Sequence, residues 1–397
     1  MIKNKVKYSQ LAFLLCVTLP AGKLLSLPSL AYRHTGRDFW IGMAIAVAVE
    51  LLSLFAVLWG ISHTQEGETL KDVLEKTVGR FFSKAIILLF AVSFFLKFLY
   101  LLSDVMVLYG DIFVLKSDWT VFAAVALLAI WFILSRGFQV VARLGEALFI
   151  PVMICLIAIS VLSLGDCSFE KLLPIAEKGA GNIMESFAYV GFAFGDGAIL
   201  MALSGDVTRG KKKTLQTLLG ATVGGIATVF VCIIYLALFG ELAFFGEVAI
   251  ARISQFNFNT SVTGRLDWLF ISGWVIAVFL LLFLYARCFF NCVEAVFFKP
   301  DKKLSVVKGG GLIIFVCFAL VVMILPLFVD FKSFIGRYFM EGFARYIEMG
   351  LTRGLAIAYP LLVVIFNKRN HRNLFCANNR QSAPLDFSVG IMEVGNE

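Results

Sequence analysis

The sequence predicts an all-α integral membrane protein with ten transmembrane helices. Of its 397 residues, 60% are hydrophobic and only 16% are charged, whereas soluble globular domains are about 45–50% apolar and about 25% charged. The 41 Phe, 6 Trp and 10 Tyr also exclude a disordered chain, because disordered chains carry little apolar surface. The third observation is the length of the individual apolar runs.

Ten apolar runs are long enough to cross the hydrocarbon core of a bilayer, which takes about 20 helical residues. The runs are continuous, so we expect helices rather than the alternating strands of a membrane barrel. All ten are expected to form one amino acid permease-like domain over residues 1–367, followed by a polar cytoplasmic tail over 368–397. The expected spans are 9–31, 39–62, 85–109, 119–135, 140–164, 183–205, 214–240, 268–291, 308–329 and 350–367.

The net charge of +8 indicates orientation. If the N-terminus is cytoplasmic, the inner segments hold 21 of the 35 Lys and Arg and the outer segments hold 10. Cytoplasmic segments of membrane proteins carry such an excess. We therefore expect both termini to be cytoplasmic, and the basic surplus does not indicate a nucleic-acid partner because no basic recognition motif accompanies it.

The sequence contains no pattern typical of an enzyme. It has no G-x-S-x-G elbow, P-loop or H-E-x-x-H helix, and only three His. Cys288 and Cys292 share a helix face, but no His lies near them to complete a metal site. We therefore expect no catalytic residues, no metal and no cofactor.

Two spans, the first and the sixth, are interrupted by Pro and Gly near the bilayer centre. Such pairs predict a five-plus-five inverted repeat, here about 9–164 and 183–367, in which broken helices 1 and 6 bind a ligand. The alternative is that Pro and Gly only kink these helices, as they often do in membranes. The matching positions and the charge on each span favour a ligand site. The candidate ligand-binding residues are Thr18, Pro20, Ala21, Gly22 and Lys23 in the first span and Gly191, Phe192, Phe194, Gly195, Asp196 and Gly197 in the sixth.

Four charged residues lie 11 to 14 residues inside their spans: Lys23, Glu50, Lys97 and Asp196. A charge at this depth costs at least about 2.5–3.5 kcal/mol and normally has a partner. One interpretation is a static network in which the two cations and two anions neutralise each other and join helices, while a Lys97 and Glu50 pair would suit proton-coupled transport. The other is that Lys23 and Asp196 contact the carboxylate and amine of an amino-acid-like ligand or carry a proton. Asp104, two turns beyond Lys97 on the same face, either lines an entry path or lies at the membrane interface.

A short amphipathic segment at 69–82 is too polar to span the membrane. Its apolar residues recur on one helical face, and Thr69 with Asp72 forms a capping box. We expect a helix on the cytoplasmic surface. The aromatic connection at 241–267 is expected to pack as short helices over the outer mouth.

Several separated motifs resemble the spore-germination permease family, the B subunit of nutrient germinant receptors, within the amino acid–polyamine–organocation superfamily. They are RGFQVVARLGEALFIP at 136–151, FGDG around Asp196, RLDWLF at 265–270 with Trp274, and Pro360 in the last span. The resemblance extends from about Tyr8 to Lys368.

This resemblance implies a ten-helix inverted-repeat protein that senses a small nutrient, such as an amino acid, in the spore inner membrane. It also implies a larger A subunit and a lipoprotein C subunit as partners, and a ligand site around Gly22 and Phe194-Gly195-Asp196. Two residues depart from the family pattern: Asp196 stands where Glu is common, and Lys23 occupies a break that is usually uncharged, where it could replace a bound cation. A proton-coupled amino acid secondary transporter is the alternative function.

Overall fold

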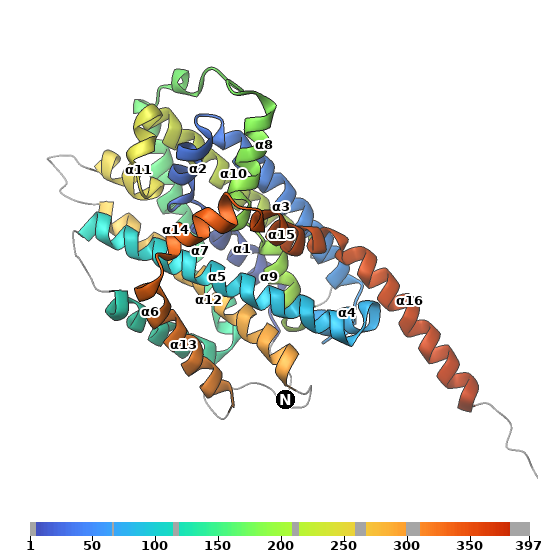
Figure 1. The fold of residues 1–397 in the computed structure, drawn as a ribbon. Helices are drawn as coiled ribbons and strands as arrows, with labels where there is room; N and C mark the ends of the chain where they lie inside the picture. The colour runs from blue at the N-terminus through green and yellow to red at the C-terminus, as the bar shows by residue number, and fades with distance from the viewer. Residues whose placement is uncertain are drawn as a thin grey trace, which may run out of the picture.

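A computed structural model describes residues 5–65, 67–113, 119–208, 214–258, 267–298 and 310–381. Within these ranges the protein is helical, and its only strand-like pairing is an isolated bridge between Val6 and Val207. Figure 1 shows a bundle of long helices with α2, α11 and the start of α8 at one end, and with α16 extending away from the rest. The predicted all-α fold class is confirmed.

The helices follow one another with short breaks. The first half comprises α1 (Tyr8–Lys23), α2 (Leu27–Thr35), α3 (Phe39–Ser62), α4 (Leu70–Val78), α5 (Arg80–Phe113), α6 (Trp119–Arg136), α7 (Phe138–Ser163), η1 (Leu164–Asp166) and η2 (Phe169–Leu172). The second half comprises α8 (Gly179–Val190), η3 (Gly191–Ala193), α9 (Asp196–Ala202), η4 (Ser204–Asp206), α10 (Thr214–Phe239), η6 (Gly240–Phe245), α11 (Ala249–Phe258), α12 (Asp267–Phe297), α13 (Gly310–Phe328), α14 (Phe331–Ile335), the π-helical η7 (Gly336–Met340), α15 (Ala344–Met349), the π-helical η8 (Gly350–Gly354) and α16 (Leu355–Gln381).

The number of spans agrees with the sequence prediction. In the described part of the chain nine segments are long and apolar enough to cross a membrane, and α1 with α2 forms a bent pair that makes a tenth. The chain is therefore a multi-pass membrane protein. The inverted relation between residues 9–164 and 183–367 stays a prediction.

The first span is broken, but later than its sequence suggests. Pro20 and Gly22 both lie inside α1, and the bend of 49° falls between Lys23 and Leu27. Pro28 explains this position, because it has no N–H to donate to the carbonyl of Leu24 and instead occupies the first turn of α2, where Pro is tolerated. The predicted break around Gly22 was therefore wrong by a few residues.

The sixth span is broken where the sequence predicts. Helix α8 ends at Val190 and continues as one 3₁₀ turn, and Phe194 then has an extended backbone. Gly195 has a φ of +123°, a conformation that favours glycine, and α9 begins at Asp196. The gap between the two half-helices leaves backbone donors and acceptors that need partners from elsewhere.

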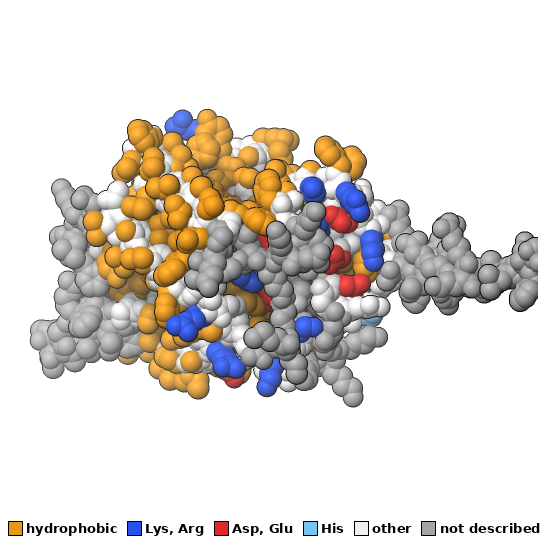
Figure 2. Space-filling model, turned by 90° about the horizontal axis from the view of Figure 1, so that it is seen from below, with side chains coloured by type: hydrophobic (Ala, Val, Ile, Leu, Met, Phe, Trp, Pro, Cys, Tyr) orange, Lys and Arg blue, Asp and Glu red, His pale blue; other side chains and the backbone are white. Residues whose placement is uncertain are grey.

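The outer surface of the bundle is apolar, as lipid contact requires. On α7, four residues spaced three or four apart are each more than half exposed: Ile150, Ile154, Ile157 and Val161. Figure 2 shows hydrophobic side chains over much of the face seen from below, with charged side chains gathered toward one side. The exposed apolar face is the one expected to meet lipid tails.

The predicted amphipathic helix forms as α4, although it ends at Val78 rather than at 82. Its place on the cytoplasmic surface stays a prediction. Thr69 and Asp72 form the capping box, with the Thr69 N–H donating to the Asp72 carboxylate at 2.8 Å. In the predicted outer connection, η6 and α11 form the expected short helices, and residues 259–266 lie outside the described ranges. Of the predicted tail, residues 368–381 continue α16.

Two glycines of α10 allow it to lie directly on α1, its most extensively packed neighbour. A Cβ atom on Gly220 would collide with the carbonyl oxygen of Ala12, and one on Gly224 would lie 2.8 Å from that of Cys16. These obstacles are backbone atoms of another helix, so they cannot move without displacing α1. Close packing through small residues is typical of membrane helices.

We predict that Gly220→Ala lowers the stability of the purified protein by about 1–3 kcal/mol, the cost of overpacking a well-packed interface. Gly181→Ala in α8 is the matched control, since a Cβ there meets nothing within 4 Å. Thermal unfolding in detergent micelles measures the difference. Equal melting temperatures for the two variants would contradict the close α1–α10 contact.

Candidate functional site

Six ionised side chains meet in the interior of the bundle, each at most 4% exposed. They form three ion pairs, of which Lys23 with Asp196 and Lys97 with Glu348 have N–O distances of 2.7 and 2.8 Å. The third, Arg353 with Glu50, has an N–O distance of 3.5 Å. Three cations and three anions give these six side chains no net formal charge, so each of the six has a compensating partner.

The Lys23 and Asp196 pair joins the two broken spans. Lys23 is the last residue of α1 and Asp196 is the first residue of α9. A cation at a helix C-terminus and an anion at a helix N-terminus are each favoured by the helix dipole. The sequence predicted both residues as the centre of the site, and the structure brings them into direct contact.

Glu50 of α3 supplies the acceptors that the second break lacks. Its carboxylate accepts hydrogen bonds from the backbone N–H of Gly195 at 3.1 Å and from that of Gly197 at 2.9 Å. A buried carboxylate thus satisfies donors at the start of α9 that have no partner within the helix. This explains why an acidic residue lies in the middle of an apolar span.

Lys97 of α5 holds the same break from the other side. Its ammonium group donates a hydrogen bond to the carbonyl of Phe194 and contacts the Glu348 carboxylate. Ser93, one turn earlier, donates to the same Glu348 oxygen at 3.1 Å. The predicted pairing of Lys97 with Glu50 was therefore wrong: each has a partner on the last span that sequence reasoning did not use.

Those two missed partners are Glu348 and Arg353. Glu348 lies two residues before the predicted start of the last span, so the sequence predicts it to lie in a loop. Arg353 lies inside that span, and an arginine within a membrane helix was the signal that could have identified it. Its guanidinium group also donates to the carbonyl of Gly191 at 3.0 Å.

The aromatic ring of Phe194 lies between two of these cations. The Lys23 ammonium and the Arg353 guanidinium carbon each lie 5.1 Å from its centroid. The neighbouring Phe192 ring contacts Lys97 at 5.8 Å and meets the Tyr100 ring edge-on. Such contacts attract a desolvated cation by about 2 kcal/mol or more.

The structure does not bring every predicted residue to the cluster. The Thr18 hydroxyl donates to the carbonyl of Leu14 within α1. Pro20 and Ala21 are buried within α1, and a Cβ on Gly22 would meet the Leu281 side chain at 2.7 Å. In the first span, only Lys23 contacts the charges directly.

Asp104 is fully buried beside the first break. Both of its carboxylate oxygens lie 2.7 Å from the hydroxyl oxygen of Ser26, which lies between α1 and α2. The Tyr100 hydroxyl is 3.1 Å from the same oxygen. Asp104 therefore contacts a side chain at the first break, whereas Glu50 accepts from backbone N–H groups at the second. Its place on an entry path or at the membrane interface stays a prediction.

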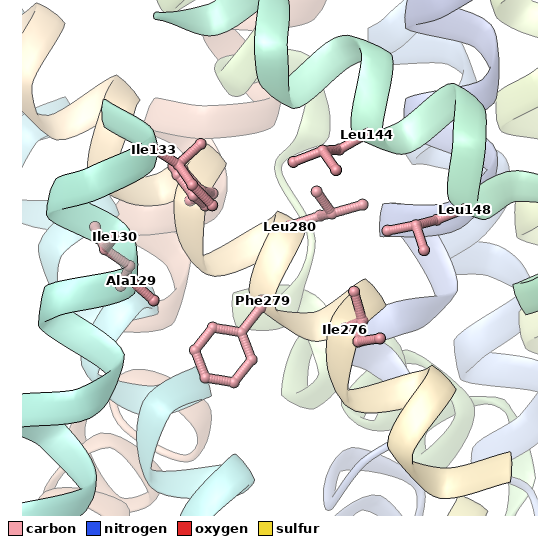
Figure 3. A pocket seen from close by; sticks show the side chains of 9 residues that line it. Ala129, Ile130, Ile133, Leu144, Leu148, Ile276, Phe279 and Leu280 are labelled. Carbon is pink, nitrogen blue, oxygen red and sulfur yellow. The ribbon is translucent and has the colours of Figure 1, made fainter. Parts of the chain in front are cut away.

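A cavity of about 80 Å³ lies apart from the charged cluster, between α6, α7 and α12. In Figure 3, Leu144 and Leu148 of α7 face Ile276 and Leu280 of α12. All of its lining side chains are apolar. It offers no polar group to an amino acid or an ion, so the charged cluster remains the candidate site.

These features define a permease-like membrane protein whose two broken helices meet at a neutral cluster of buried charges. The chain belongs to the spore germination protein family, whose model matches residues 5–330. It is 22% identical over 248 residues to spore germination protein YndE of Bacillus subtilis strain 168, covering 62% of this chain and 67% of that protein. The predicted family is thereby confirmed.

The fold was also compared with solved structures. A crystal structure of a manganese transporter from Eremococcus coleocola, in complex with an aromatic bis-isothiourea compound, is similar with a TM-score of 0.45 and 13% sequence identity. The match covers 90% of this chain and 76% of that one.

We predict that Gly195→Ala destabilises the second break. A Cβ there would lie 2.6 Å from the Lys97 ammonium nitrogen, which is held by Phe194 and Glu348. Gly137→Ala is the control: its φ of +90° imposes similar backbone strain, but a Cβ meets nothing within 4 Å. We expect the melting temperature in micelles to fall further for Gly195→Ala; an equal fall would mean that only backbone strain matters.

We also predict that Lys23→Met is less stable than the double variant Lys23→Met/Asp196→Asn. Removing one partner of a buried ion pair costs about 3–5 kcal/mol because the other charge is left uncompensated. Converting Asp196 to the neutral amide removes that charge. Thermal unfolding of both variants checks this order, and a double variant less stable than either single variant would contradict it.

Proposed function

We propose that this chain is the membrane subunit of a nutrient germinant receptor and binds a small amino-acid-like nutrient where its two broken helices meet. The observation that carries the proposal is the Lys23 and Asp196 ion pair, which joins the end of α1 to the start of α9 at 2.7 Å. An amino acid carries one anionic and one cationic group. It can therefore bind both residues in place of their mutual contact without changing the buried charge.

Membership of the spore germination protein family supports this role. The protein then acts in the spore inner membrane with both termini in the cytoplasm, as the distribution of Lys and Arg indicates. An A-type subunit and a lipoprotein C-type subunit are its partners. Opening of the Lys23 and Asp196 pair by the nutrient changes the angle between half-helices, and that movement is the signal that reaches the partners.

A proton-coupled amino acid transporter is the second candidate. The observation in its favour is that Lys23 and Asp196 are 0% and 1% exposed. A proton that passes from Lys23 to Asp196 leaves a neutral pair, so the two groups can exchange a proton without leaving an unpaired buried charge. Uptake of labelled amino acids into proteoliposomes, driven by a pH gradient and the purified chain alone, would favour transport over sensing.

We predict that Asp196→Asn strongly weakens nutrient binding. Loss of one charge-assisted hydrogen bond weakens binding by about 10–100-fold. The measurement is the shift in melting temperature of the purified protein with a mixture of the twenty L-amino acids, together with germination of spores carrying the variant on the same mixture.

The matched control is Asp206→Asn, a carboxylate ten residues further along that pairs with Arg287 at 3.5 Å outside the break. We expect this variant to respond to the mixture as the wild type does. A normal response of Asp196→Asn in both assays would contradict the assigned site.

A further inference from the structure

Within the described part of the protein, four polar atoms of the buried cluster have no hydrogen-bond partner: Oδ1 of Asp196, Oε2 of Glu348, and Nε and Nη1 of Arg353. Of these, Nε of Arg353 faces the Glu50 carboxylate at 3.5 Å, which leaves the other three. Their side chains are at most 4% exposed. Buried polar groups without partners cost about 1–3 kcal/mol each and are uncommon in native proteins. Two unpaired acceptors and one unpaired donor in one cluster match the groups of a zwitterion, which presents an ammonium donor and a carboxylate acceptor.

The side chains that carry these atoms are arranged around Phe194. Arg353 lies over the Phe194 ring at 5.1 Å, and Lys23, which pairs with Asp196, lies over the same ring at the same distance. Glu348 is linked to the Phe194 backbone through Lys97, which contacts both. The second break is therefore surrounded by Asp196 from its own span and by two residues from the last span.

The local backbone of the last span brings Glu348 and Arg353 together. Residues Gly350–Gly354 form a π-helical turn, in which backbone hydrogen bonds connect residues five apart. Glu348 and Arg353 are five residues apart, a spacing that places two side chains on different faces of a regular α-helix. Single π-helical turns inside α-helices are frequent at functional sites.

The other contacts of Arg353 leave Nη1 available. Nη2 donates to the Gly191 carbonyl, and Nε lies 3.5 Å from the Glu50 carboxylate. The guanidinium group is thus fixed in position by the second break and by α3. Arginine held in this way is suited to a carboxylate, because its planar group offers several donors in one direction.

We propose that the π-helical turn of the last span forms the third side of the ligand site. In this arrangement Arg353 binds the carboxylate of the ligand through Nη1, and Glu348 and Asp196 bind its ammonium group through their unpaired oxygens. The assignment rests on the proposed function. It keeps the site and the ligand class of that proposal but moves the carboxylate contact from Lys23 to Arg353, a residue outside both broken spans.

The test compares each L-amino acid with its carboxamide, which keeps the ammonium group but lacks the carboxylate. Binding to the purified protein in lipid nanodiscs is measured by the shift in melting temperature and by isothermal titration. We expect the wild type to prefer the acid over the amide by at least about tenfold, the value of one charge-assisted hydrogen bond. In Arg353→Gln this preference should fall to about twofold or less, while Arg353→Lys retains part of it.

Arg345→Gln is the matched control, because Arg345 belongs to the same segment but pairs with Glu185 at 2.6 Å, away from the cluster. We expect it to keep the wild-type preference. Glu348→Gln provides the second arm: it should weaken binding of both acid and amide, because both carry the ammonium group. If Arg353→Gln fails to fold, Arg353→Lys and Glu348→Gln still give the acid-to-amide ratio.

The outcomes separate this assignment from the proposed function. An unchanged acid-to-amide ratio in Arg353→Gln, with binding still strongly weakened by Asp196→Asn, would overturn the role of Arg353 and leave the proposed function standing. A wild type that none of the twenty amino acids stabilises would overturn both. A purely structural role for Arg353 would lower the affinity for acid and amide equally, and this result would also overturn the assignment.

Discussion

The need to neutralise charge inside the membrane determines how this bundle is assembled. Six ionised side chains lie in its interior, and each has a partner on a different segment of the chain. Because an unpaired charge at this depth costs at least about 2.5–3.5 kcal/mol, any arrangement that separates a pair is disfavoured. The three pairs join α1 to α9, α5 to α15 and η8 to α3, so the broken spans are held between helices from both ends of the sequence.

The same side chains also supply the hydrogen bonds that the broken backbone lacks. Glu50 accepts from the N–H groups at the start of α9, while Lys97 and Arg353 donate to the carbonyls of Phe194 and Gly191. Asp104 contacts the first break through the Ser26 side chain. A backbone held by side chains can exchange those partners for a ligand, whereas the hydrogen bonds of a continuous helix cannot be exchanged without unwinding it. This is a physical reason for ligand sites to lie at broken membrane helices.

Helix starts and breaks that depend on neighbouring residues could be predicted from the sequence. Capping by Thr69 and Asp72 predicted the start of α4, and the glycines around Asp196 predicted the second break. The sequence predicts the first break at Pro20 and Gly22, but both residues lie inside α1, and the break comes just before Pro28, in the first turn of α2. The contribution of Glu348 and Arg353 was missed because they lie about 150 residues from the break they contact. No pattern within one span indicates such a distant partner.

By itself the sequence determined the membrane class, the ten spans, the broken sixth helix and the presence of charges at its depth. Hydrophobic length, Gly and Pro act within a single segment, so their effect can be recognised without knowing the neighbours. Only the tertiary structure decided which charges pair, because ion pairing depends on distances between helices that are remote in sequence. It showed that Lys97 pairs with Glu348 and that Arg353 pairs with Glu50. The buried charged cluster therefore includes the last span as well as the two broken spans that the sequence identified.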